Sequence, residues 1–518
     1  MKFISIGFLI FLAAVFLAYY LIPKKYRWIE LLAASYVFYC FAGIKYIGFI
    51  LVTTLSTYFV AKLLEYMSGR ADSYVESHRD EMSKDERKEY RSKQKKKRFL
   101  LLCIGLVFNF GILAALKYTP LAETAYISGF LSLIGISFYM FQTMGYLIDV
   151  YRSKAVAEKN VAKFALFVSF FPQLVQGPIS RYGDLAPQLF EGHDFDIHNV
   201  SFGIQRIIWG FFKKLVIADR VAVAVVAMKN SPDEFYGLSV LVLIIFYSIN
   251  IYADFTGGMD IAIGVGETLG IKMTENFKRP FFSKSTKEYW NRWHITMGSW
   301  FTDYVFYPLS VCTPMRSVSK KCRELLGNNI GKRIPMYIAT VLTWLLTGVW
   351  HGSGLNFIVW GLLNGVIILV SEELSPLYKR FHNRFPRLGS SAPYVSFMMF
   401  RTFFIMGIIR ILDVYRDVGL TFRMWGSVLV SPNPSVLFNG GLLGFSLGTA
   451  DYMILAVGVI LTFAVSVIRE RSGKDIRELL ENKTVLCSFI FTALIAVTVI
   501  FGAYGNGYDA NQFIYNQF

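Results

Sequence analysis

The sequence of 518 residues has few cysteines and lacks several common catalytic motifs. Its five cysteines include no CxxC pair, which argues against a disulfide framework and against a bound metal such as structural zinc. No GxSxG motif, P-loop or strand-associated GxGxxG is present, so a serine hydrolase, a nucleotide hydrolase or a dinucleotide-binding protein has no support. The chain also has no internal repeat, which weakly disfavours a secondary transporter built from duplicated halves.

Charged residues are sparse, at 17%, whereas 54% of the residues are hydrophobic and long apolar runs recur along the whole chain. This composition predicts an all-helical membrane protein that crosses the bilayer many times. The opening run, residues 3–22, is too long for a typical signal-peptide core and is followed by no small-x-small cleavage site, so we expect a retained first span. The net charge of +17 fits basic cytoplasmic loops better than nucleic-acid binding, because no basic helix with interleaved stacking aromatics occurs.

The hydrophilic segment 67–98 is the longest interruption before residue 150 and holds eleven lysines or arginines against seven acidic residues. The excess of positive charge predicts that it lies in the cytoplasm and that the N-terminus faces outward. Its last residues, KQKKKR at 93–98, are typical of a charge cluster that sets topology and contacts lipid. We therefore expect one membrane-embedded domain, residues 1–518, with a basic cytoplasmic insert.

The other expected spans are apolar runs separated by charged loops. They lie at about 28–44, 46–66, 99–117, 127–150, 238–255, 335–372, 394–412, 452–468 and 485–503. Residues 162–189 are apolar but contain Pro172, Gly177 and Pro178, which predicts a broken, re-entrant segment that lines a cavity. The amphipathic stretch 200–228 is expected along the cytoplasmic interface.

His351 lies in the apolar stretch 335–372, which has no formal charge from Met336 to Val370. Helical spacing places Thr343, Thr347 and His351 on one face, and the glycines that follow favour a helix end. A buried histidine that only ties two helices together is the structural alternative. Polar groups inside a membrane are costly and usually line a cavity or a substrate path, so we favour a functional role.

His294 is the other histidine in a membrane-like context, within the polar block 275–309. Helical spacing predicts that Trp290, His294, Met297 and Phe301 share one face. Basic residues crowd just before it and fit either a membrane surface or the phosphates of a nucleotide-containing donor; they are Lys278, Arg279, Lys284 and Lys287.

Polar residues near the two histidines or within apolar runs are the further candidates. Asp254 and Asp260 are expected to be hydrogen-bonded to backbone donors freed around Gly257 and Gly258, with a proton or metal site as the alternative. The candidates for lining a tunnel or contacting substrate are Asn250, Asp254, Trp290, Asn291, Asp303, Thr347 and Trp350.

Two histidines at polar breaks suit acyl transfer to a hydroxyl. An alcohol attacks well only as a base removes its proton, and neutral imidazole is well matched to that task. The reaction also needs donors aimed at the oxyanion of the acyl group, which the sequence does not identify.

A series of motifs resembles the membrane-bound O-acyltransferase superfamily, and most of all the bacterial alginate O-acetyltransferase subgroup. The similar segments are ISFYMFQTMGYLIDVYR (136–152), SFFPQLVQGPISRY (169–182), YADFTGGMDIAIG (252–264), ENFKRPFF (275–282), WNRWHITMGSWFTDYVFYPL (290–309) and GVWHGSGLNFIVWGLLNG (348–365). The resemblance implies that His351 is catalytic and that His294 is a second functional position. It also implies about eleven membrane helices, with re-entrant and interfacial ones, around a central tunnel.

The resemblance further implies acetyl-CoA as co-substrate, no permanently bound cofactor and a hydroxyl of an exported polysaccharide as acceptor. A separate extracytoplasmic acetyltransferase commonly completes the transfer, and the cytoplasmic membrane is the expected location. Two departures stand out: SVCTPMRSVSKKCRELLGNNIGKR replaces a glycine-rich loop after Leu309, and the tail reads GNG where GPG is usual.

The leading hypothesis is therefore acetyl transfer from CoA towards an extracytoplasmic glycan. D-alanyl transfer to teichoic acid from a carrier-protein thioester is the rival within the same superfamily. A polysaccharide transporter or channel is the alternative of a different class, since it too would need a polar tunnel with broken helices.

Overall fold

The computed structural model describes residues 4–41, 43–118 and 135–504. These residues form helices, and no strand occurs among them beyond a single bridge between Phe277 and Trp293. Their contacts divide into two compact units, one of residues 4–204 and 262–274 and the other of residues 205–261 and 275–504. The predicted span 127–150 is described only from residue 135, and the tail beyond residue 504 lies outside the described residues.

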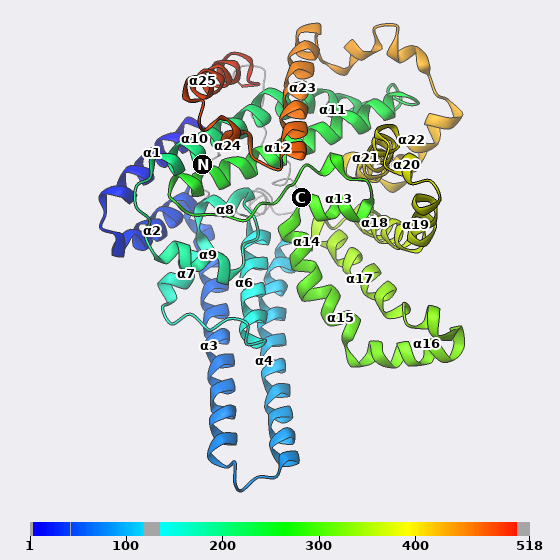
Figure 1. The fold of residues 1–518 in the computed structure, drawn as a ribbon. Coiled ribbons are helices and arrows are strands. Elements are labelled where there is room, and N and C mark those ends of the chain that lie inside the picture. Colours follow the sequence, from blue (N-terminus) through cyan, green and yellow to red (C-terminus); the bar gives the residue numbers. More distant parts are fainter. Residues whose placement is uncertain (1–3, 42, 119–134, 505–518) are drawn as a thin grey trace. The chain divides into compact units, whose positions relative to one another are not determined.

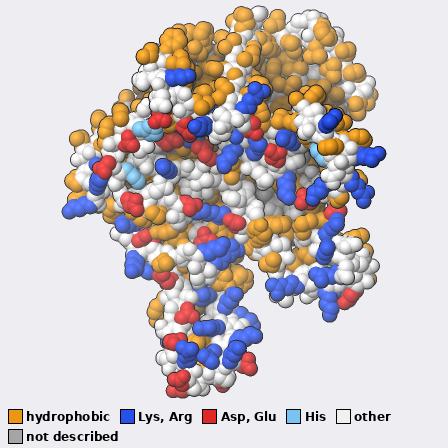
Figure 2. Space-filling view, viewed as in Figure 1, with side chains coloured by type: hydrophobic (Ala, Val, Ile, Leu, Met, Phe, Trp, Pro, Cys, Tyr) orange, Lys and Arg blue, Asp and Glu red, His pale blue; other side chains and the backbone are white. Residues whose placement is uncertain are grey.

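The first unit is built around a long antiparallel pair of helices, α3 (Ile47–Ser77) and α4 (Lys84–Tyr118) (Figure 1). The hydrophilic segment 67–98 is thus the far part of this hairpin, with a short turn between the two helices. Figure 2 shows charged side chains of both signs gathered over that end. The other helices that begin in this unit are α1 (Ile6–Leu21), α2 (Arg27–Cys40), α6 (Ile136–Tyr151), α7 (Val161–Ser169), α8 (Phe171–Gln176), α9 (Tyr182–Phe190) and α10 (Ile197–Phe212).

The stretch 162–189 is broken, as its prolines and glycine predict. It consists of the short helices α7, α8 and α9, of which α8 has Pro172 in its first turn and is followed directly by Gly177. Most of its side chains are buried within the unit. Its re-entrant placement in a bilayer stays a prediction.

The second unit contains the stretches that hold both histidines. The helix α12 (Ser239–Thr268) runs without interruption through Gly257 and Gly258, so the predicted end near residue 255 is wrong. The other helices of this unit are α11 (Asp219–Asn230), α13 (Thr286–Arg292), α14 (Ile295–Phe301), α15 (Tyr307–Val311), α16 (Thr313–Gly331), α17 (Ile334–His351), α18 (Leu355–Glu373), α19 (Ser375–Arg384), α20 (Pro386–Gly389), α21 (Ala392–Tyr415), α22 (Val418–Val430), α23 (Thr449–Ser472), α24 (Ile476–Leu480) and α25 (Thr484–Phe501).

Eight helices of the described residues are long and apolar enough to cross a membrane, which makes the protein a multi-pass membrane protein. They are α3, α4, α12, α17, α18, α21, α23 and α25, and α1 and α22 are shorter apolar helices. Figure 2 shows hydrophobic side chains gathered over α23, as expected for a surface that faces lipid. The figure of about eleven crossings stays a prediction.

The helices α17 and α18 form a hairpin, and their backbones come into close contact where the two helices cross. A Cβ atom added to Gly348 would lie 2.3 Å from the Phe357 carbonyl oxygen, and one added to Gly361 would lie 2.4 Å from that of Trp344. Two glycines at the crossing therefore allow the close approach, as small residues do between membrane helices. This contact fixes the end of α17, where His351 lies.

Replacing Gly348 with alanine should separate α17 from α18 and destabilise the protein by about 1–3 kcal/mol, because the added methyl group has no space. Gly426→Ala in α22 is the matched control, since an added Cβ there meets no atom within 4 Å. Thermal unfolding of both variants in detergent checks this. Equal midpoints for the two variants would contradict the close-contact argument.

Candidate active site

His351 is the last residue of α17 and is buried, at 8% exposure. The predicted face of α17 is confirmed, because Thr343 and Thr347 are buried with it. Their hydroxyls donate to backbone carbonyls one turn earlier, at 2.6 Å from Ala339 O and 2.8 Å from Thr343 O. The break after His351 is also confirmed, since α18 begins only at Leu355.

His294 is fully buried between α13 and α14 and has a left-handed backbone with φ of 49°. A residue other than glycine pays a strain cost in this conformation, so its surroundings must hold it there. The turn at His294 interrupts the helix, and the prediction that Trp290 and His294 share one continuous helical face with Met297 is therefore wrong. The sequence signal was misleading because a single left-handed residue does not disturb the apolar spacing around it.

Asn276 is the residue that holds this turn. Its backbone carbonyl accepts the Ile295 N–H at 3.0 Å, and its side-chain oxygen accepts both the backbone N–H of Thr296 at 3.0 Å and the Thr296 hydroxyl at 2.9 Å. The same amide lies 3.3 Å from Nδ1 of His294. Asn276 is 1% exposed, so these bonds form away from water and restrict the imidazole orientation.

The indole ring of Trp350 lies beside both histidines. Its ring centroid is 6.1 Å from that of His294 and 4.7 Å from that of His351. The Trp360 ring also packs on the His351 imidazole, with 4.6 Å between the two ring centroids. Trp290 packs in turn on Trp360, with a centroid distance of 5.8 Å. Two residues 57 positions apart in the sequence are thus brought to one aromatic cluster.

Burial controls the protonation of His294. Desolvation lowers the pKa of its imidazole to about 3, so the ring is neutral at physiological pH. The rings of Phe255 and Phe277 pack on it, with centroid distances of 4.9 and 6.4 Å. An imidazole in such surroundings offers a lone pair and an N–H but resists taking up a full positive charge.

Asp254 and Asn250 lie in the interior of α12, whereas His294 and His351 lie at the ends of other helices. Asp254 forms an ion pair of 2.6 Å with Lys214, and the Asn250 amide donates to the Ala218 carbonyl at 2.8 Å. The expected bonds from freed backbone donors do not form, because α12 is continuous. Instead the carboxylates of the buried Asp254 and the half-buried Asp260 have buried lysines as partners.

The remaining candidates differ in exposure and partners. Asn291 is exposed, whereas Asp303 and Trp290 are half-buried. Of the basic residues, Lys278 and Lys284 are exposed, Arg279 binds Glu470 at 2.5 Å, and Lys287 binds Glu372 at 3.0 Å. A role of these four in phosphate binding stays a prediction.

Sequence reasoning did not single out Asn276 or Trp360. Both residues lie within segments that resemble the acyltransferase superfamily, Asn276 in ENFKRPFF and Trp360 in GVWHGSGLNFIVWGLLNG. Their spacing does not indicate contact with a histidine. Asn276 is 18 residues from His294 in the sequence, and the segment between them is not one continuous helix. Among the described residues, no group of three or more His, Cys, Asp or Glu side chains is arranged to hold a metal ion.

The model of the membrane-bound O-acyltransferase (MBOAT) family matches residues 38–321, which is more than half of the chain. The protein therefore belongs to this family and is an O-acyltransferase. The matched region includes His294 and ends before His351.

Named relatives agree with this membership and make the chain AlgI-like. A probable alginate O-acetylase AlgI of Azotobacter vinelandii is 32% identical over 393 residues, which cover 72% of this chain and 69% of that protein. A peptidoglycan O-acetyltransferase of Helicobacter pylori is 28% identical over 422 residues, 74% of this chain and 71% of the relative. A teichoic acid D-alanyltransferase of Streptococcus thermophilus is 28% identical over 248 residues, 47% of this chain and 57% of the relative.

Replacing Asn276 with alanine should destabilise the protein by about 1–3 kcal/mol, because the buried Thr296 N–H and hydroxyl lose their acceptor. Asn291→Ala removes the same side chain from an exposed position and should change stability by less than about 0.5 kcal/mol. Denaturant or thermal unfolding of the two variants measures the difference. A similar effect of both would show that the Asn276 amide is not what holds the turn.

The stability of the protein should fall more steeply below pH 6.5 in the wild type than in a His294→Gln variant. The unfolded imidazole binds a proton with a pKa of about 6.5, whereas the folded one does so only at about 3. Between these values the unfolded state holds the extra proton, so falling pH favours unfolding. Unfolding midpoints of both proteins from pH 8 down to about 4 check this, and parallel curves would refute the burial of a neutral His294.

Proposed function

We propose that this protein transfers an acetyl group from cytoplasmic acetyl-CoA to a hydroxyl group of an extracytoplasmic polysaccharide. The observation that carries the proposal is that the imidazole rings of His294 and His351 both contact the Trp350 ring in the second unit, with centroid distances of 6.1 and 4.7 Å. The relatives support the acyl group and acceptor class, since two of those named above are O-acetylating enzymes of polysaccharides.

In the proposed reaction His351 is the general base. As the hydroxyl oxygen of the acceptor attacks the thioester carbon, the imidazole takes the hydroxyl proton, a C–O bond forms and the C–S bond breaks. The proton then passes to the departing thiolate, which leaves CoA as a free thiol and the imidazole neutral. A base in this role typically accelerates transfer by about 10²- to 10⁴-fold.

His294 orients groups in this scheme and does not itself become charged. Its low pKa makes it a weak base, while its fixed ring can donate or accept one hydrogen bond without moving. The Asn276 amide beside Nδ1 restricts that orientation. A tunnel that joins the two membrane faces, location in the cytoplasmic membrane and a separate extracytoplasmic acetyltransferase partner belong to the same proposal.

D-alanyl transfer from a carrier-protein thioester is the second candidate. It uses the same chemistry at the acyl carbon, and the similarity to a teichoic acid D-alanyltransferase over 47% of this chain favours it. The greater coverage of the O-acetylating relatives places it second. Ester-linked acetate and ester-linked D-alanine, measured in cell walls with and without the gene, distinguish the two.

His351→Ala should lower acetyl transfer by about 10²- to 10⁴-fold at matched expression. The measurement follows radiolabelled acetyl-CoA incubated with membranes and counts label in protein, glycan and free acetate. His382→Ala is the matched control, because His382 is a half-buried residue of α19 that contacts neither His294 nor Trp350, and its loss should leave transfer unchanged.

Three outcomes of this experiment are informative. Label in glycan or in a partner with the wild type and the control, but not with His351→Ala, supports the proposal. Equal transfer by all three proteins would remove His351 from the chemistry. Glycan movement across the membrane without consumption of thioester would instead favour a transporter or channel.

A further inference from the structure

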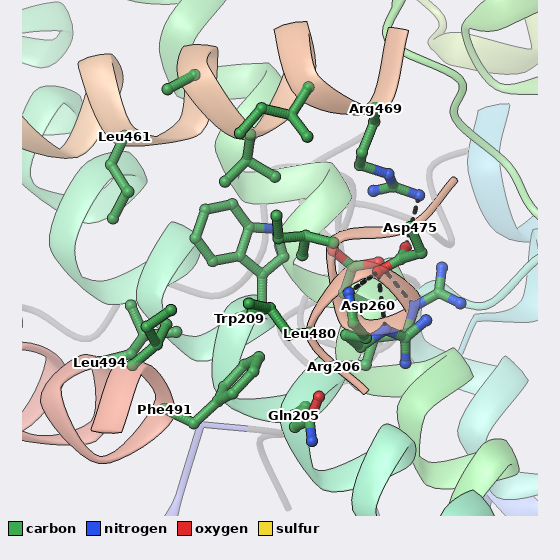
Figure 3. Close-up of a pocket in the computed structure, with 16 residues that line it drawn as sticks. Gln205, Arg206, Trp209, Asp260, Leu461, Arg469, Asp475, Leu480, Phe491 and Leu494 are labelled. Atoms are coloured by element: carbon green, nitrogen blue, oxygen red, sulfur yellow. Dashed lines mark hydrogen bonds and ion pairs between the residues drawn. The ribbon is translucent and has the colours of Figure 1, made fainter. Parts of the chain in front are cut away.

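A pocket of about 260 Å³ lies in the second unit, between α10, α12, α23, α24 and α25. His294, His351 and the aromatic side chains that contact them do not line it. Figure 3 shows that its walls differ from one end to the other. Leu461, Phe491 and Leu494 lie towards one end, and Arg206, Asp260, Arg469 and Asp475 lie together at the other.

The apolar end is formed mainly by a stripe along α23. Leu461 and Val465 lie one turn apart on this stripe, and Arg469 follows one turn later. Eight residues of helix span about 12 Å, so the pocket is elongated along α23. Trp209 of α10 and Phe491 of α25 close its sides.

The charged end holds more cations than anions. Asp475 binds Arg469 at 3.0 Å and Arg477 at 3.1 Å, so two guanidinium groups share one carboxylate. Burial alone would raise the pKa of Asp475, but these two arginines hold it below its usual range and keep the group ionised.

The second carboxylate at this end is also shared. Asp260 binds Arg206 at 2.9 Å and Lys213 at 2.6 Å, and Arg206 binds Glu275 as well, at 2.7 Å. Among the residues that line the pocket, Arg206, Arg469 and Arg477 are cations, and Asp260 and Asp475 are anions. The net positive charge is complementary to one further anionic group.

The pocket opens between helices that face lipid. In the apolar 18-residue segment of each helix, only 17% of the residues of α23 and 11% of those of α25 are buried within the protein. Most of both helix surfaces is therefore left for the bilayer. Arg469 lies in the last turn of α23, and Asp475 follows three residues after that helix ends. The charged end thus lies where a span meets the membrane surface, and the apolar end lies at hydrocarbon depth.

We propose that this pocket binds one anionic phospholipid, with an acyl chain along the α23 stripe and its phosphate group at Arg469 and Arg477. A phospholipid has its charge at the membrane surface and its chain below, which is the polarity of the pocket. A polysaccharide would find no hydrogen-bonding partners among the leucine and phenylalanine side chains. Basic pockets between membrane helices commonly recognise anionic lipid headgroups. The site is independent of the proposed acetyl transfer.

The test uses the full-length protein in nanodiscs with equal amounts of phosphatidylglycerol and phosphatidylcholine that carry the same acyl chains. The protein is then extracted into mild detergent, and retained lipid is identified by native mass spectrometry. We expect one retained lipid per chain, with phosphatidylglycerol favoured about tenfold over phosphatidylcholine, because its net negative charge complements the arginines.

Substitutions at the two ends of the pocket test acyl-chain binding and headgroup binding separately. Val465→Trp fills the apolar end and should abolish retention of both lipids, whereas Val457→Trp, at an exposed position of the same helix, should not. Arg469→Gln with Arg477→Gln should remove the preference for phosphatidylglycerol, and Arg471→Gln, which removes an exposed arginine from the same helix end, should preserve it. Ala464→Leu narrows the pocket with less strain and serves if Val465→Trp does not fold.

Three results would overturn the proposal. One is equal retention of the two lipids by the wild type, which would mean that the arginines do not recognise the headgroup. Another is unchanged retention by Val465→Trp or Ala464→Leu, which would place any bound lipid elsewhere. Displacement of retained lipid by free CoA or inorganic phosphate would likewise show that the cations form a general anion site instead.

Discussion

Buried charge is the constraint on which the second unit depends, because a charged side chain in an apolar interior is costly unless it is paired. Lys213 and Lys214 are almost fully buried, and their ammonium groups meet Asp260 and Asp254 on α12. The backbones approach closely enough for this because Gly210 faces Gly257, where an added Cβ would lie 2.6 Å from the carbonyl oxygen. Removing either partner of such a pair would leave an uncompensated charge, so the pairs restrict how α12 lies against the preceding segment.

The same charges connect to the candidate active site through the chain itself. Arg206 binds both Asp260 and Glu275, and Glu275 directly precedes Asn276. Asn276 in turn accepts the bonds that hold the turn at His294. A strained histidine is thus supported by a loop whose start is fixed by a buried arginine. If His294 orients groups in the proposed reaction, its imidazole must be held precisely, and rigid neighbours achieve this better than a flexible loop.

Sequence reasoning predicted the helical membrane fold, the broken stretch 162–189 and the helix end at His351, because apolar runs and glycine or proline positions have local causes. It failed where tertiary contacts decide. The amphipathic stretch 200–228 was expected at an interface, yet its Lys213 and Lys214 are buried, since their partners on α12 are 47 and 40 residues away in the sequence. The left-handed turn at His294 could not be predicted either, because its support comes from the Asn276 side chain.

The environments of the two histidines favour different tasks for them. His294 is enclosed by Phe255, Phe277 and Trp350, and protonating it would cost several kcal/mol more than protonating imidazole in water, given its pKa of about 3. His351 ends α17, and the partial negative charge at the C-terminal end of a helix stabilises positive charge that develops nearby. Under the proposed function, His351 is therefore the better of the two to take the proton of an acceptor hydroxyl. In that scheme a neutral His294 beside the same tryptophan would leave the site with one base and one fixed polar group, as acyl transfer to an alcohol requires.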